Sequence, residues 1–187
     1  MSHPFEKLHP VNQRKLFIFL LILTILIMLI MNMVGMTLYT AEAPSGIISF
    51  ELAYSPGRTQ EIINSWSSAA QLRAAFIQGL DFLFPLVYSV MFGLGSIMAA
   101  GVFRIRGNPF ARWGVTLAWG LGLAALCDYI ENIALITLLF GRVVPPYPEI
   151  AGVCAVIKFT VILIGSIYML FGLVMRILPQ RSTKAAT

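Results

Sequence analysis

Four ionisable residues stand inside apolar stretches of this chain, where a bilayer would penalise them. They are Asp81, Asp128, Glu131 and Lys158. A charged side chain at the centre of a membrane-spanning helix costs about 2.5–3.5 kcal/mol on insertion scales, and such residues are candidates for function by default. Four of them would remove much of the free energy of insertion unless they neutralise one another.

The spacing of these residues predicts that they share helix faces. Asp128, Glu131 and Asn132 stand at i, i+3 and i+4, which places their side chains on one face of a helix. Asp81 and Tyr88 are two helical turns apart and form a second stripe. At about 1.5 Å of rise per residue, each charged residue lies about 12–21 Å from the nearest charged residue flanking its stretch. We therefore expect one cluster in the outer half of the bilayer, built from three helices.

The charges of this predicted cluster do not balance. Three carboxylates face one ammonium, and burial and like charge both disfavour ionised carboxyls, so at least one carboxyl should carry a proton near neutrality. A protonatable pair, Asp128 and Glu131, beside Lys158 suits acid–base chemistry or proton-coupled transport. The same groups are also compatible with a staple that holds three helices in register.

Pro85 follows Asp81 by four residues, so it removes the backbone hydrogen bond to the Asp81 carbonyl. We expect it to kink the second membrane helix beside this acid. The freed carbonyl is then available to a bound group.

The composition requires a membrane environment. The chain has 187 residues, of which 58% are hydrophobic and only 11% charged, with a mean hydropathy of +0.84. A soluble domain is about 25% charged, and the apolar runs here reach the roughly 20 residues that span a bilayer. A disordered chain, a disulfide scaffold and a nucleic-acid-binding domain are excluded. The expected spans cover about residues 16–36, 74–103, 113–140 and 150–175.

Lys and Arg residues predict the orientation of these spans. The N-terminal tail 1–15, the second loop and the C-terminal tail 176–187 carry three each, nine in all, whereas the first and third loops together carry three. Positive residues favour the cytoplasmic side. We expect a multi-pass protein of the inner (plasma) membrane with both termini in the cytoplasm.

The outer loop, residues 37–73, contains one clear helix signal. Ser55-Pro56 is typical of a helix start, and Ile62, Ile63 and Trp66 then fall on one side. We expect an amphipathic helix at the outer interface with Trp66 near the lipid headgroups. It is either a lid over an outward-facing cavity or a loop that lies on the bilayer.

The sequence predicts no cofactor and no metal site. His3 and His9 both lie in the N-terminal tail, and Lys158 would repel a cation among the carboxylates. Cys127 and Cys154 have no ligand neighbours at metal spacing, so we expect them to pack as small apolar residues.

Several of these motifs together resemble a family. They are Leu80-Asp81-Phe82-Leu83-Phe84-Pro85-Leu86-Val87-Tyr88, Asp128-Tyr129-Ile130-Glu131-Asn132, Pro145-Pro146 and Lys158-Phe159. The combination is similar to a widespread, functionally uncharacterised family of small bacterial four-helix membrane proteins. A looser likeness, through Asp81, Pro85 and Tyr88, is to the sterol-isomerase and sigma-2-receptor type of membrane fold. That likeness implies a lipid-like ligand.

We thus expect an all-α membrane bundle of four transmembrane helices with an interfacial helix in the first outer loop. Asp81, Tyr88, Asp128, Glu131, Asn132 and Lys158 are the expected ligand-binding residues. The first functional hypothesis is a site for a lipid-like small molecule, as a binding protein or an enzyme. The alternatives are a structural subunit of a membrane complex and proton-coupled transport. The expected partners are membrane lipids, with homo-oligomers and larger complexes left open.

Overall fold

The computed structural model describes residues 2–179, which are all-α and contain no β-strand. The α-helices, in chain order, are α1 (Pro10–Gly35), α2 (Ile47–Glu51), α3 (Pro56–Ser65), α4 (Ser68–Leu80), α5 (Phe84–Ile105), α6 (Trp113–Leu139) and α7 (Tyr147–Ile177). Short 3-10 helices are η1 (Pro4–Lys7), η2 (Met36–Leu38) and η3 (Pro109–Arg112). Arg181 and Lys184, two of the residues used to predict orientation, lie outside the described residues.

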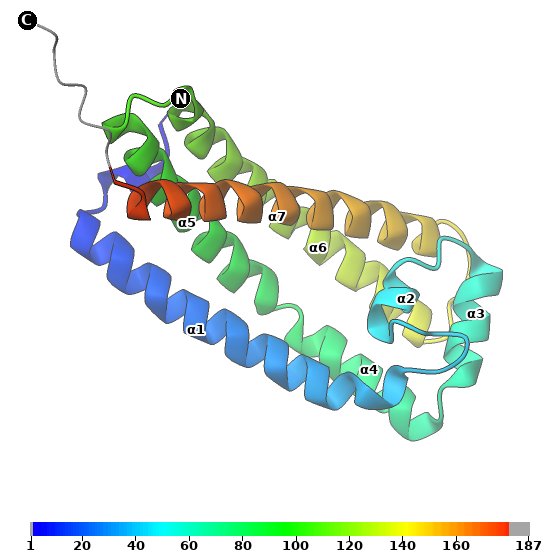
Figure 1. Ribbon diagram of the computed structural model, residues 1–187. Helices are drawn as coiled ribbons and strands as arrows, with labels where there is room; N and C mark the ends of the chain where they lie inside the picture. The colour runs from blue at the N-terminus through cyan, green and yellow to red at the C-terminus, as the bar shows by residue number, and fades with distance from the viewer. Residues whose placement is uncertain (1, 180–187) are drawn as a thin grey trace, which may run out of the picture.

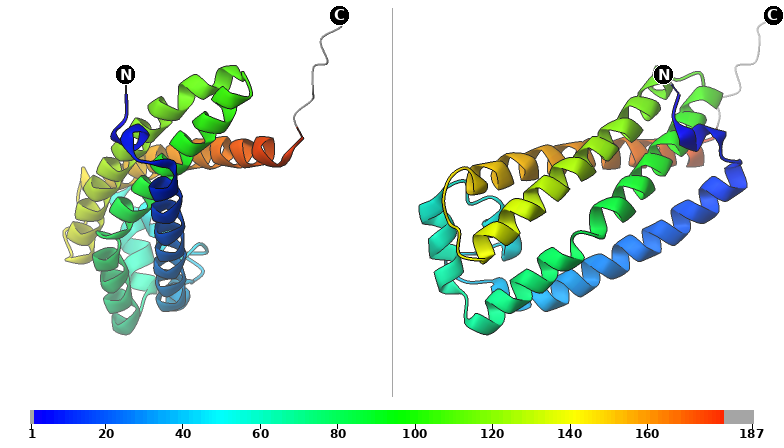
Figure 2. Two further views of the ribbon diagram at one scale, coloured as in Figure 1. Left: turned by 90° about the vertical axis from the view of Figure 1, so that its left-hand side faces the viewer. Right: turned by 180° about the vertical axis from the view of Figure 1, so that it is seen from behind.

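Helices α5, α6 and α7 pack on one another, and α1 lies along α5 on the side away from α6 (Figures 1 and 2). The start of α1, the α5–α6 connection and the end of α7 lie at one end of the bundle, which we call the basic end. The opposite end carries residues 39–67, including α2 and α3, and we call it the cap end. Much of α1 is unburied, with Met33 71% exposed.

Four helical segments are long and apolar enough to cross a membrane. They are Pro10–Leu38, Phe84–Ile105, Pro109–Leu139 and Tyr147–Ile177, and the protein is a multi-pass membrane protein. The first helix begins before the apolar run expected from residue 16. His9 caps it by accepting a hydrogen bond from the Val11 amide, and Pro10 occupies its first position.

The second expected span, 74–103, is two helices rather than one kinked helix. α4 ends at Leu80 and α5 begins at Phe84, with a tight turn over the three residues between them. Within this turn Leu83 N donates to Leu80 O at 3.0 Å. Pro85 lies in the first turn of α5, where a missing N–H costs little. The proline thus favours the start of a new helix. The chain is divided into two helices at this point, instead of forming the single kinked helix that the sequence predicted.

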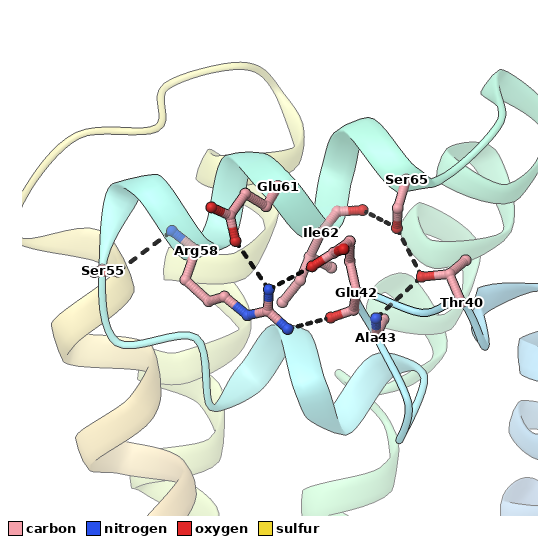
Figure 3. A network of polar contacts seen from close by, with 8 residues as sticks. All are labelled: Thr40, Glu42, Ala43, Ser55, Arg58, Glu61, Ile62 and Ser65. Atoms are coloured by element: carbon pink, nitrogen blue, oxygen red, sulfur yellow. Dashed lines mark hydrogen bonds and ion pairs between the residues drawn. The ribbon is translucent and has the colours of Figure 1, made fainter.

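The cap end is a folded unit (Figure 3). Ser55 caps α3 by accepting from Arg58 N, and the Arg58 guanidinium donates to Glu42 Oε2 at 2.7 Å and Glu61 Oε2 at 2.9 Å. The amphipathic helix is confirmed, since Ile62 and Ile63 are buried. The placement of Trp66 near headgroups is wrong: it is buried and donates its Nε1–H to Leu38 O at 2.9 Å. Because the Trp66 indole N–H already has a backbone acceptor inside the protein, it does not require the polar groups of the membrane interface.

Close approach of α5 and α6 depends on Gly114, and this gives a first prediction. A Cβ there would meet the Ala100 side chain and lie 2.8 Å from Ser96 O, whereas a Cβ at Gly122 would meet nothing. Overpacking of this kind costs about 1–3 kcal/mol. We expect Gly114→Ala to lower the midpoint temperature of thermal unfolding in detergent, and Gly122→Ala, which only replaces a helix-interior glycine by a better helix former, not to lower it. Equal midpoints would contradict this packing.

Candidate functional site

The Lys158 ammonium is the centre of the polar cluster. It comes from α7 and donates to Asp128 Oδ1 at 3.0 Å and Glu131 Oε1 at 2.9 Å, both from α6. The i, i+3 spacing of the two acids places both carboxyls beside the same ammonium. All three side chains are buried. The structure therefore brings together the three charges that the sequence assigned to α6 and α7.

Two further hydrogen bonds connect α5 and the α4–α5 turn to this centre. Tyr88 OH donates to Asp128 Oδ2 at 3.0 Å, so this carboxylate is held by a cation and a phenol. Asn132 Nδ2 donates to the backbone carbonyl of Asp81 at 2.9 Å. This is the carbonyl that Pro85 cannot pair. The expected free ligand group is thus satisfied by Asn132, and Asp81 can contribute only its carboxyl to a bound molecule.

Glu51 is a member of the cluster that the sequence analysis did not identify. It is the last residue of the five-residue α2, is 6% exposed, and places Oε2 at 3.8 Å from Lys158 Nζ. The sequence analysis placed residue 51 in the outer loop 37–73, away from the expected cluster. The sequence did contain an indication that Glu51 is buried, since it is the one charged residue in the apolar run 46–54. The cluster accordingly has three carboxyls within 4.0 Å of one ammonium, with the buried Asp81 carboxyl as a fourth outside ion-pairing distance of Lys158.

Four buried side chains of the cluster and its surroundings have atoms without a hydrogen-bond partner among the described residues, and one of these atoms is Glu51 Oε2. Glu131 Oε2 and Asn132 Oδ1 are two such acceptors, although the other polar atom of each side chain is paired. Gln78, on α4 one turn before Asp81, is fully buried with both amide atoms unpaired. Buried polar atoms in native structures nearly always have partners. The cluster therefore has hydrogen-bonding capacity that its own side chains do not use.

A cavity of about 220 Å3 adjoins the cluster. Its polar wall includes Glu51, Asp81, Asp128 and Lys158, and Tyr88 lines it beside them. Its apolar wall comes from α1, α2 and α7: Met28, Met31, Ile47, Ile48, Phe159 and Ile162. Because α1 packs on α4 and α5, with α7 across the cavity, the space lies between α1 and α7.

No protein-family model matches this chain. No curated protein and no solved structure is similar to it either. The site must therefore be interpreted from its own geometry.

Glu51 gives a prediction about pH. Burial raises the pKa of its carboxyl from an ordinary value of 4.5, and the Lys158 ammonium opposes this rise only in part. The folded protein then binds this proton more tightly than the unfolded chain, so stability falls as the pH rises above 4.5. We expect Glu51→Gln to match the wild type near pH 4.5. At pH 8 its midpoint temperature should be higher, by about 2–4 °C per kcal/mol recovered.

Thermal unfolding in detergent across this pH range measures the effect. Glu61→Gln is the matched control, because Glu61 is exposed and exposed pairs contribute little. Parallel pH profiles for the wild type and Glu51→Gln would contradict burial of Glu51 beside Lys158.

Proposed function

We propose that the protein binds a lipid-like small molecule in the cavity between α1 and α7, with the polar cluster as the headgroup site. The observation that carries the proposal is the position of the cavity, which brings carboxyls from α2, α6 and the α4–α5 turn against an apolar wall. A site with one apolar side and a few convergent polar groups suits an amphipathic ligand.

The size of the cavity favours partial burial of this ligand. Its volume of about 220 Å3 is smaller than the roughly 300–1,000 Å3 of pockets that enclose drug-sized molecules. We infer that the headgroup occupies the cavity and that an apolar tail extends along α1 and α7 among the lipids. The exposed apolar residues of both helices are compatible with this arrangement.

The charges favour a headgroup that donates hydrogen bonds or carries positive charge. Lys158 already faces three carboxyls, Asp128, Glu131 and Glu51, so it has little to offer an anionic group. Four carboxyls less one ammonium leave up to three negative charges in the cluster. We therefore assign Lys158 the neutralisation of the acids rather than the binding of an anionic headgroup.

For orientation we propose that the cap end faces away from the cytoplasm, in the inner membrane. The nine-to-three distribution of Lys and Arg supports this assignment. The resemblance to small bacterial four-helix membrane proteins also stays a proposal, carried by the motifs around Asp81 and Asp128.

Native mass spectrometry with lipid analysis of the detergent-purified protein tests the proposal. We expect the wild type to retain a specific small molecule, and the isosteric variant Asp128→Asn/Glu131→Gln to lose it while staying folded. Asn64→Ala, on the exposed face of α3, is the control for handling losses. Retention by the isosteric variant would contradict the site assignment.

One observation favours a second function, a structural staple in a membrane complex. Lys158 and Asp128 satisfy one another within the cluster, with Tyr88 as an additional donor. A staple requires no ligand, and hydrophobic replacement of a buried ion pair can be neutral or stabilising. Under this function, Lys158→Met/Glu131→Leu would assemble and function normally.

The α4–α5 break bears on the third alternative, proton-coupled transport. The sequence analysis expected one kinked helix over residues 74–103, whereas the helix breaks between Leu80 and Phe84, just before the candidate span Phe84–Ile105. Broken helices are typical of transporter sites. Proton uptake coupled to solute flux in proteoliposomes would favour this function over binding alone.

A further inference from the structure

A second cavity lies at the basic end, remote from the polar cluster. It has a volume of about 500 Å3 and is lined by residues of α1, α5 and α7, including Arg14, Arg104 and Arg176. Glu6 is the one acid in this lining and lies 3.6 Å from Arg104. Three arginines and one glutamate leave two positive charges at the mouth of the cavity.

An apolar groove joins this basic cavity. It has a volume of about 360 Å3, and its lining includes Phe17 of α1, Phe92 of α5 and Met169 of α7. Met98, Val102 and Arg176 line both spaces, so groove and cavity adjoin.

The depth of this site matches the far side of a bilayer. Arg176 follows Lys158 by 18 residues on α7, which corresponds to about 27 Å of helix. The hydrocarbon core is about 30 Å thick. The arginines therefore lie at headgroup level in the opposite leaflet, and the groove extends from them into the hydrocarbon.

We propose that this site holds an anionic phospholipid, with its phosphate on Arg14, Arg104 and Arg176 and one acyl chain in the groove. Guanidinium groups pair with phosphate through two parallel hydrogen bonds, and here arginines from three helices line one cavity. The two uncompensated positive charges select an anionic over a zwitterionic lipid. The groove distinguishes the site from general attraction of a basic surface to anionic lipid. The proposal does not depend on the function of the polar cluster.

The test measures lipid affinity of the full-length protein by native mass spectrometry. The probes are phosphatidylglycerol and phosphatidylcholine with identical acyl chains. We expect the wild type to hold one phosphatidylglycerol at least tenfold more tightly than phosphatidylcholine. Arg14→Gln/Arg176→Gln should remove this preference. Lys15→Gln/Arg112→Gln, which removes the same charge at the same end outside both cavities, should keep it.

A groove variant tests the acyl chain separately. Leu173→Trp, which lines the groove and not the basic cavity, should lower the affinity for both lipids at least tenfold, whereas Val174→Trp, on exposed α7 surface outside the groove, should not. Equal affinity of the wild type for the two lipids would overturn the proposal. An equal loss of this preference in Arg14→Gln/Arg176→Gln and in Lys15→Gln/Arg112→Gln would also overturn it. So would glycerophosphate that competes for the site as effectively as phosphatidylglycerol does.

Discussion

Lys158→Met is expected to lower the free energy of unfolding by about 3–5 kcal/mol, the usual result of breaking a buried ion pair by removing one partner. The Lys158 ammonium is the one cation within 4.0 Å of Asp128, Glu131 and Glu51 among the described residues. Without it, three carboxyls stay buried with no counter-charge. Thermal unfolding in detergent at pH 7.5, together with the yield of folded protein, measures this loss.

A second variant shows whether charge is the cause. Adding Glu131→Gln to Lys158→Met removes one of the uncompensated carboxyls, so the double variant should be more stable than Lys158→Met alone. Lys15→Met, at the exposed start of α1, should behave as the wild type. A Lys158→Met protein as stable as the wild type would contradict the cluster as described.

Asn132→Leu is the second change with a large expected effect. Asn132 is fully buried and supplies the hydrogen bond to the Asp81 carbonyl, which Pro85 cannot supply. Leaving a buried carbonyl unpaired costs about 1–3 kcal/mol. Pro85→Ala restores a backbone N–H that can reach this carbonyl if α4 and α5 join. Asn132→Leu should therefore be less destabilising in the Pro85→Ala background than in the wild type.

A double-mutant cycle on these two positions gives the coupling free energy. We expect a coupling of about 1 kcal/mol with the sign of a rescue. Additive effects of the two changes would mean that Asn132 does not stabilise the α4–α5 turn through Asp81. Asn64→Leu on the exposed face of α3 controls for the amide-to-leucine change alone.

The parts of this site that follow from local rules could be predicted from the sequence. Asp128, Glu131 and Asn132 share a helix face because of their spacing alone, and hydropathy alone identified the membrane segments. The prediction was weaker at Pro85, where the same rule allows a kink or a new helix start. Tertiary contacts decided between them, since Asn132 of α6 supplies the bond that a continuous helix would have made.

Glu51 could not be placed by such rules. Its position beside Lys158 depends on how residues 39–67 fold back over the ends of α6 and α7, stabilised by the Arg58 contacts and the buried Trp66. These contacts join residues far apart in sequence. The cavity also depends on tertiary packing. It forms because α1 packs on α5 and leaves a space between itself and α7.

The most direct test of the central claim blocks the cavity and leaves the charges in place. Ile162→Trp, on the apolar wall of the cavity, adds bulk and changes none of the charged residues, whereas Leu163→Trp places the same ring on exposed surface. Native mass spectrometry of both purified variants beside the wild type is the measurement. The ligand site predicts a small molecule retained by the wild type and Leu163→Trp and lost from folded Ile162→Trp. The same retained molecules in all three proteins would contradict it.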